Sequence, residues 1–83
     1  MYHLYILECA DHTLYTGITV NVRRRVGEHN ASTRGAKYTR SRRPVTLMYS
    51  KKFRSRSAAS KEEFRIKTLS RPEKLALVKK TSD

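Results

Sequence analysis

The hydrophobic and polar positions near the N-terminal end of the chain predict a pair of β-strands. Residues Tyr2–Leu7 are rich in aromatic and aliphatic side chains, and Thr13–Thr19 is a second run rich in Thr, Tyr and Ile. The five residues Glu8–His12 between them predict the connection of a β-hairpin. If the hairpin is symmetric about its centre, Tyr5 lies opposite Tyr15. Their rings then share one face, because strand side chains alternate with period two.

A helix is predicted directly after this hairpin. Asn21 is a good N-cap, and apolar Val22 and Val26 follow it at helical spacing, so we expect a short helix that ends near residue 30. Arg25 and His29 are four residues apart on this helix and are therefore neighbours on its surface.

A basic loop and a third strand come next. Residues 31–43 contain Ser, Thr, Gly and many cations with little apolar periodicity, so we interpret them as a loop that is mobile without its ligand. Pro44 then precedes residues 45–49, in which Val45, Leu47 and Tyr49 alternate with Thr46 and Met48. This alternation predicts a strand.

The C-terminal third predicts two helices. The first covers residues 55–69, with Glu63 at the edge of an inward-facing stripe. That stripe consists of Ala58, Ala59, Glu62, Ile66 and Leu69. Ser70 and Glu73 fit a capping box that begins the second helix, which continues through Leu75, Leu77 and Val78. Residues 79–83 are expected to be a frayed tail.

The order ββαβαα predicts an α+β fold, a small three-stranded antiparallel sheet flanked by helices. With 83 residues and 37% hydrophobic content, the chain has enough apolar material for one core and no room for a second. We therefore expect a single domain over residues 1–83 whose functional site is a shallow, open groove.

The charge of the chain points to a polyanionic partner. There are 19 Lys and Arg residues against 7 Asp and Glu residues, a formal net charge of +12. This excess is larger than solubility requires and is typical of nucleic-acid binding. Between Glu28 and Glu62 there is no acidic residue, so the charge is concentrated. Ten cations occupy that interval: Arg34, Lys37, Arg40, Arg42, Arg43, Lys51, Lys52, Arg54, Arg56 and Lys61.

Other classes of protein fit the sequence less well. No segment approaches the roughly 20 apolar residues of a membrane span, and there is no secretory start, so no membrane association is expected. Cys9 is the single cysteine, which excludes an intramolecular disulfide and a cysteine-based zinc site. We expect a cytoplasmic protein that is a monomer or a weak oligomer.

The spacing of several chemically capable residues resembles the GIY-YIG nuclease superfamily. His3-Leu4-Tyr5 stands where that family has Gly-Ile-Tyr, and Tyr15-Thr16-Gly17 stands for Tyr-Ile-Gly. An arginine on the next helix, Arg25, and a later helical glutamate, Glu63, complete the pattern. Gly17 is expected to permit a close approach at the end of the strand.

Further blocks are similar to the small, stand-alone bacterial branch of this family, the YhbQ-like proteins. The resemblance covers nearly the whole chain. The blocks are Leu14–Thr19, Glu28–Asn30, Gly35–Thr39, Arg42–Val45 and Ile66–Arg71.

The resemblance implies a divalent cation held by Glu63. Mg²⁺ suits a site with one protein carboxylate because it keeps most of its waters, and Mn²⁺ is an alternative. The adjacent Glu62 is the competing ligand. A simpler interpretation is that Glu63 is a solvated helix residue paired with Lys67 one turn later.

The resemblance also implies roles for the remaining site residues. Arg25 would contact the scissile phosphate through its fork of donors. Tyr5 would orient or deprotonate the attacking water, and Tyr15 would be a second phenol near the phosphate or the metal-bound water. Because the reference pKa of tyrosine is about 10, a cation must lower it if Tyr5 is a base. His29 would relay a proton or bind phosphate.

The implied activity is that of a Mg²⁺-dependent endonuclease that hydrolyses DNA rather than RNA, with structured or branched DNA as a substrate and DNA repair as a setting. An alternative is a catalytically silent nucleic-acid-binding module, and a weaker one is an accessory protein that docks on a partner. Tyr38 would stack on a base or pack on the core. The expected nucleic-acid contacts are Arg23, Arg24, Arg34, Lys37, Tyr38, Arg40, Arg42 and Arg43.

Overall fold

The computed structural model describes residues 1–31 and 34–81 and contains a three-stranded antiparallel sheet. Its strands are β1 (Tyr2–Glu8), β2 (Leu14–Thr19) and β3 (Thr46–Phe53). Its helices are α1 (Val22–Ala31), α2 (Lys37–Arg40), α3 (Arg56–Lys67) and α4 (Arg71–Thr81). The strand order is β2-β1-β3, so β1 is the central strand. The expected α+β fold with an antiparallel sheet is confirmed, with the short helix α2 as an addition to the predicted order.

The hairpin between β1 and β2 turns one residue later than predicted. The Cys9 amide donates to the Thr13 carbonyl at 2.8 Å. The Asp11 carboxylate accepts from the amide of Thr13 at 3.1 Å and from its hydroxyl at 2.6 Å. His12 has a φ of 67°, in the left-handed region that non-glycine residues enter mainly in turns. These contacts centre the turn on Asp11 rather than on Ala10.

This turn changes the pairing of the two tyrosines. Tyr5 pairs with Gly17, and Tyr15 pairs with Leu7, so the prediction that the tyrosines lie directly opposite each other is wrong. The shift is two positions along β2, which keeps both rings on one face of the sheet. The ring centroids are 6.5 Å apart, and the predicted convergence of the two phenols is confirmed.

Position 17 requires a glycine because the ring of Tyr5 lies across it. A Cβ atom at Gly17 would lie 2.6 Å from Cζ of Tyr5 and closer still to the Tyr5 hydroxyl. The close approach expected at this glycine is therefore confirmed, and the group that approaches is the phenol ring.

The helix α1 begins as predicted, since the Asn21 side chain accepts a hydrogen bond from the Arg24 amide at 3.0 Å. The basic segment after it is wrongly predicted as a loop, because α2 forms a helical turn there with Thr39 fully buried. Gly35 lets this segment approach α1, since a Cβ atom there would lie 2.7 Å from the Glu28 carbonyl oxygen. Positions 32 and 33 of the predicted loop lie outside the described residues.

The third strand is longer than the alternation predicts. β3 pairs with β1 from Thr46 to Phe53, past the predicted end at Tyr49. A register shift between Ile6 and Leu7 of β1 interrupts the alternation. Residues 50–52 are polar or charged, so the sequence pattern does not predict the second half of this strand. Its pairing with β1 defines it as a strand.

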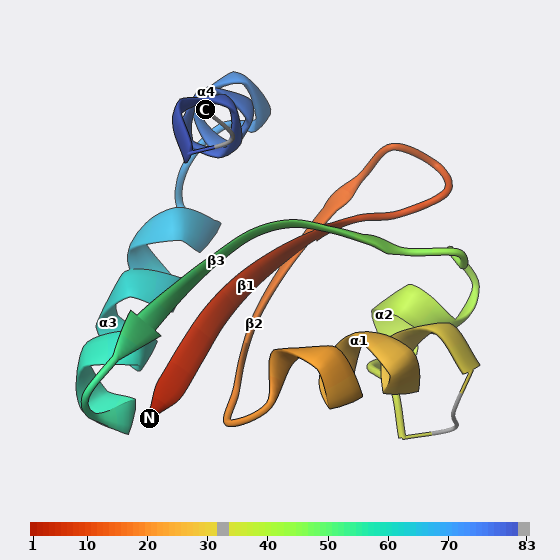
Figure 1. The fold of residues 1–83 in the computed structure, drawn as a ribbon. Coiled ribbons are helices and arrows are strands. Elements are labelled where there is room, and N and C mark those ends of the chain that lie inside the picture. The colour runs from red at the N-terminus through yellow and green to blue at the C-terminus, as the bar shows by residue number, and fades with distance from the viewer. Residues whose placement is uncertain (32–33, 82–83) are drawn as a thin grey trace.

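Each face of the sheet carries its own core, so the prediction of one core with no room for a second is wrong. Figure 1 shows α3 along one side of the sheet, with α1 and α2 along the opposite side. The α3 side is packed by Leu4, Ile6, Tyr49, Ile66 and Val78. The α1 side is packed by Tyr5, Leu7, Cys9 and Val45, with Val22 and Val26 of α1 against them.

The predicted stripe on α3 is only partly correct. Ala59 and Ile66 are fully buried, and Leu69 just beyond the helix packs on the same core, but Ala58 is exposed. Glu62 is half-buried and bonded within its own helix. The helix is also shorter than predicted, because it begins after the N-cap Ser55 and ends at residue 67.

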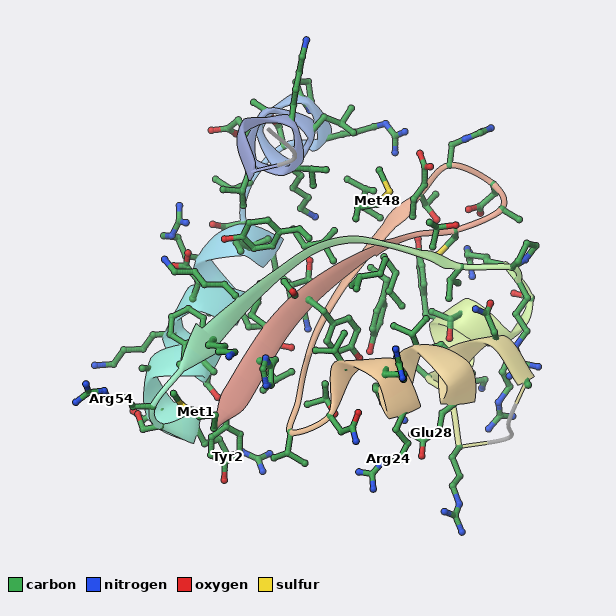
Figure 2. All side chains as sticks on the ribbon, in the orientation of Figure 1. Met1, Tyr2, Arg24, Glu28, Met48 and Arg54 are labelled. Atoms are coloured by element: carbon green, nitrogen blue, oxygen red, sulfur yellow. The ribbon has the colours of Figure 1, made fainter. Side chains whose placement is uncertain are left out.

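The last helix begins at the predicted capping box. The Ser70 amide donates to the Glu73 carboxylate at 2.9 Å, and the Glu73 amide donates to the Ser70 hydroxyl at 3.4 Å. α4 extends through Thr81, so the predicted frayed tail is wrong for residues 79–81, and residues 82 and 83 lie outside the described residues. Met48 of β3 points toward α4 in Figure 2.

The helices of residues 1–31 and 34–81 lack the length or the apolar run that a membrane span requires.

We predict that Gly17→Ala destabilises the protein by about 1 to 3 kcal/mol, because the new methyl group must displace the ring of Tyr5. Gly27→Ala is the matched control. Gly27 lies in α1, has no atom within 4 Å of the position that a methyl group would take, and should gain up to about 1 kcal/mol from helix propensity. Urea unfolding midpoints measure both changes. Equal effects of the two substitutions would contradict the close approach of Tyr5.

Candidate active site

A chain of hydrogen bonds on the α1 side of the sheet joins three elements. The Tyr5 hydroxyl of β1 lies 2.8 Å from Nε2 of His29 on α1. Nδ1 of the same ring lies 2.8 Å from the hydroxyl of Thr39 on α2. The three side chains are 1%, 0% and 0% exposed, respectively. Both ring nitrogens of His29 therefore have protein partners. Thr39 holds the imidazole ring, and the ring in turn fixes the position of the Tyr5 hydroxyl.

Burial keeps His29 uncharged. Burial first, and then the nearby guanidinium of Arg25, lower the pKa of His29 to about 4. At neutral pH the imidazole is neutral and can donate one hydrogen bond and accept another. Because the side chain has no exposed surface, the phosphate contact suggested by the sequence does not fit this position.

The Tyr5 hydroxyl is also perturbed. Its pKa is raised to about 12, mainly by burial, although the Arg25 guanidinium acts in the lowering direction. The charges of Tyr15 and Glu63 act in the raising direction. The lowering expected from a nearby cation is thus outweighed by burial, and Tyr5 is protonated at neutral pH.

Arg25 is held at the site by several acceptors. Its Nη1 donates to the Glu28 carboxylate at 2.9 Å and to the Arg34 carbonyl at 2.8 Å. These two bonds use both hydrogens of Nη1, and the guanidinium also acts on the pKa of the Tyr5 hydroxyl. The side chain is 26% exposed, so a fixed cation beside Tyr5 remains accessible from solvent.

Tyr15 is part of a stack of rings that leads from His29 to the surface. Its centroid is 5.2 Å from that of His29 in an edge-on arrangement and 5.8 Å from that of Tyr38 in a stacked one. Arg42 covers the Tyr38 ring at 4.0 Å and donates to the Asp11 carboxylate at 3.0 Å. The hairpin turn and α2 together support Tyr15, which is only partly buried.

The two candidate glutamates of α3 have different surroundings. Both oxygens of Glu62 accept from Arg65, at 2.8 and 2.7 Å, and its charge acts on Tyr49 on the α3 side of the sheet. Glu63 instead acts electrostatically on Tyr5. Its carboxylate lies 3.4 Å from Nζ of Lys67, which is the helical pair that the simpler interpretation expects.

A metal at this site would have one protein carboxylate. Within residues 1–31 and 34–81, no group of three or more His, Cys, Asp and Glu side chains could hold a metal. This excludes a chelating site of the zinc type from the described part of the chain. The single oxygen-donor group of Glu63 fits a hydrated Mg²⁺ or Mn²⁺ ion.

The predicted nucleic-acid contacts fall into two groups. Arg24 points away from the sheet in Figure 2 and lies 4.0 Å from Glu28. Arg42 and Arg43 are partly buried, and Arg43 donates to the His29 carbonyl at 2.6 Å. The exposed members of the predicted set are Arg23, Arg24, Arg34, Lys37, Tyr38 and Arg40.

Sequence reasoning missed two residues that hold the site together. Thr39 lies among cations, where no apolar periodicity marks it as buried. Asn30 accepts from the Val45 amide at 2.6 Å and donates to the Val45 carbonyl at 3.0 Å, which fixes the segment before β3 on α1. The only sequence signal for either residue was its place in a block that resembles the family.

Comparison with known proteins supports this resemblance. Residues 1–76 match the profile of the GIY-YIG catalytic domain. A UPF0213 protein of Desulfotalea psychrophila is 60% identical over 76 residues, which cover 92% of this chain and 69% of that protein. A UPF0213 protein of Halobacterium salinarum is 57% identical over 77 residues, which cover 93% of this chain and 99% of that one.

Two solution NMR structures show the same fold. The UPF0213 protein of Bacillus halodurans is 45% identical, with a TM-score of 0.63 over 98% of this chain and 86% of that one. A protein of E. faecalis is 38% identical, with a TM-score of 0.64 over 99% of this chain and 88% of that one. This chain belongs to the GIY-YIG family of nuclease domains, among its UPF0213 members.

Proposed function

We propose that this protein is a Mg²⁺-dependent endonuclease that hydrolyses phosphodiester bonds of DNA, including structured or branched DNA. The observation that carries the proposal is the convergence of two phenols and a fixed guanidinium, with a carboxylate in electrostatic range. Phosphodiester hydrolysis needs an oriented water, compensation of charge on the phosphoryl oxygens and stabilisation of the leaving oxygen. The site contains candidate groups for the first two of these requirements.

Glu63 is the proposed metal ligand. GIY-YIG nucleases generally use a divalent metal, and one carboxylate with a mostly hydrated ion matches the preference of Mg²⁺. When bound, the ion would supply Lewis-acid stabilisation of charge on the phosphoryl group. Glu63 has to release Lys67 to serve this role, whereas Glu62 is committed to Arg65 by two short hydrogen bonds.

Arg25 is the proposed phosphate contact. Its Nη1 is anchored to Glu28 and Arg34, which holds the plane of the guanidinium before substrate arrives. Such preorganisation favours the transition state because the cation has little reorganisation left to undergo. The remaining N–H groups and the partial exposure of the side chain suit contact with a phosphoryl oxygen.

The two tyrosines have separate proposed roles. Tyr5 is protonated in the unliganded protein, so its proposed role is to orient the attacking water rather than to deprotonate it, once substrate binding gives water access to its buried hydroxyl. Tyr15 reaches the surface and is the phenol that meets the phosphate. His29 acts as a positioning residue, because it holds the Tyr5 hydroxyl from a fully buried position.

The cationic surface supports nucleic acid as the substrate. Exposed cations on α1 and α2 lie beside the site, and they would bind the phosphate backbone without reading sequence. DNA is preferred to RNA in this proposal on the basis of the family resemblance.

A catalytically silent nucleic-acid-binding module is the second candidate. Two features favour this candidate. The Glu63 carboxylate is paired with Lys67, and the raised pKa of Tyr5 keeps its hydroxyl protonated, so in the unliganded protein Glu63 is not free to bind a metal and Tyr5 does not act as a base. This candidate predicts salt-sensitive binding that is indifferent to EDTA and to Tyr5→Phe, with no cleaved product. Nicking by purified protein that EDTA abolishes would count against it.

The neutral state of His29 predicts a pH-dependent stability. The pKa of His29 is about 4 in the fold and 6.5 when unperturbed, so the unfolded chain binds more protons between these values. The free energy of unfolding should therefore fall as pH decreases from 6.5 to 4, with a contribution of about 2 to 4 kcal/mol from this residue. Urea unfolding of the wild type and of His29→Gln measures it. The same pH dependence in both proteins would refute the buried neutral histidine.

Substitution of Glu63 tests the proposed activity. With plasmid and branched DNA in Mg²⁺, wild type should nick, whereas Glu63→Ala should bind DNA but cut it about 100-fold more slowly or not at all. Glu62→Ala is the matched control on the same helix and should keep its activity, because Glu62 bonds to Arg65. Lys67→Ala separates loss of the ion pair from loss of the carboxylate and should also cut. Equal cutting by Glu63→Ala and wild type would remove Glu63 from the mechanism.

A further inference from the structure

A groove of about 610 Å³ opens between α1 and β3, beside the candidate active site. Val22 and Val26 line it from α1, and Leu47 and Ser50 line it from β3. Ser50 is the strand partner of Tyr5, so the groove borders the central strand at the level of that residue. Of the residues that line the groove, only Arg23 has a role proposed above, as a contact to the phosphate backbone.

The floor of the groove is apolar and incompletely covered. Val22 and Val26 pack on the same core as Tyr5 but are only half-buried, and Leu47 is 41% exposed. All three side chains lie on the α1 side of the sheet. Val22 and Val26 belong to α1, and Leu47 pairs with Leu7, which is part of the core on that side. An exposed apolar surface framed by polar residues is typical of a binding site.

The rim of the groove is cationic. Arg23 of α1 and Lys52 of β3 line it and are exposed, and no acidic residue is among its described lining residues. Lys51 also belongs to the lining, but its amine lies 5.5 Å from the centre of the Phe53 ring. The groove therefore combines an apolar floor with positive charge on both walls.

This combination matches one nucleotide of a single strand. A nucleobase has a flat apolar face, and its phosphate is an anion, so the two parts fit the floor and the rim. In a duplex, neighbouring bases cover both faces of each base, and only an unpaired nucleotide can lay a face on protein side chains. The volume lies within the range of about 300 to 1,000 Å³ that is usual for small-molecule sites.

We propose that the groove binds an unpaired nucleotide of the strand that is cut, with its base on Val22, Val26 and Leu47 and its phosphate between Arg23 and Lys52. The proposal rests on the proposed function and deepens it, because it assigns a substrate with a single-stranded segment next to the scissile phosphate. Strand ends, loops and junctions present such a segment, whereas a continuous duplex does not.

Binding without cleavage tests this proposal. Fluorescence anisotropy in EDTA compares a labelled single-stranded oligonucleotide with the same sequence as a duplex, so the result does not depend on activity. Leu47→Thr keeps a strand-forming residue but removes apolar surface, and it should weaken single-strand binding about threefold or more. Duplex binding should stay unchanged.

Two further variants complete the test. Leu75→Thr is the matched control, because Leu75 on α4 is 39% exposed and lies outside the groove. It should leave both affinities unchanged. Lys52→Gln alters an exposed side chain without disturbing the core, and it should reduce the salt dependence of single-strand binding by about one counterion.

The outcomes separate this proposal from the proposed function. Unchanged single-strand binding by Leu47→Thr and Lys52→Gln would overturn the groove as a nucleotide site while the endonuclease proposal stands. Failure of wild type to bind either form of DNA would remove both. A concentration-dependent dimer that Leu47→Thr abolishes, seen by sedimentation, would assign the groove to a second copy of the chain and would also overturn the proposal.

Discussion

The hydrogen bond between Tyr5 and His29 fastens the centre of the sheet to α1, and the candidate site is arranged around it. The two polar atoms are 2.8 Å apart, and both side chains are almost completely buried. Leaving either group without a partner there would cost about 1 to 3 kcal/mol, so the pair constrains the packing of both elements. Thr39 extends the constraint to α2, and Gly17 provides the space that the Tyr5 ring occupies.

The site divides into buried groups that set positions and accessible groups that can meet a ligand. Tyr5, His29 and Thr39 form the buried part, where burial keeps the phenol protonated and the imidazole neutral. Arg25 and Tyr15 reach solvent from elements that this buried part holds together. The arrangement places a fixed positive charge beside an uncharged hydroxyl, which suits a phosphoryl group better than it suits a neutral substrate.

The sequence predicted the hairpin face, the start of α1 and the capping box of α4, because each depends on residues close together in the chain. The predicted pairing of Tyr5 with Tyr15 was wrong because the Asp11 side chain and the left-handed backbone of His12 move the turn by one residue. The second half of β3 and the helix α2 were not predicted, for a related reason. Their residues are polar, and their structure depends on contacts with β1 and α1 that no local pattern records.

The candidate site was predictable as a set of residues but not as a geometry. The alternation of side chains along a strand predicted that the two phenols lie on one face of the sheet. The family resemblance indicated Arg25 and Glu63. Neither showed that Tyr5 is buried with a pKa of about 12, whereas helical spacing alone predicted the pair of Glu63 and Lys67. Desolvation depends on the whole packed structure, which is why the sequence left open both deprotonation of the water by Tyr5 and phosphate binding by His29.

The proposed hydrolysis requires that Glu63 shares one site with Tyr5 and Tyr15. Titration of the isotope-labelled protein with Mn²⁺, followed by paramagnetic broadening of NMR signals, tests this requirement directly. We predict selective broadening of signals from Glu63, Tyr5 and Tyr15 in wild type, and its loss in Glu63→Gln. Broadening that centres on another carboxylate, such as Asp11 or Glu73, and persists in Glu63→Gln would contradict a shared site.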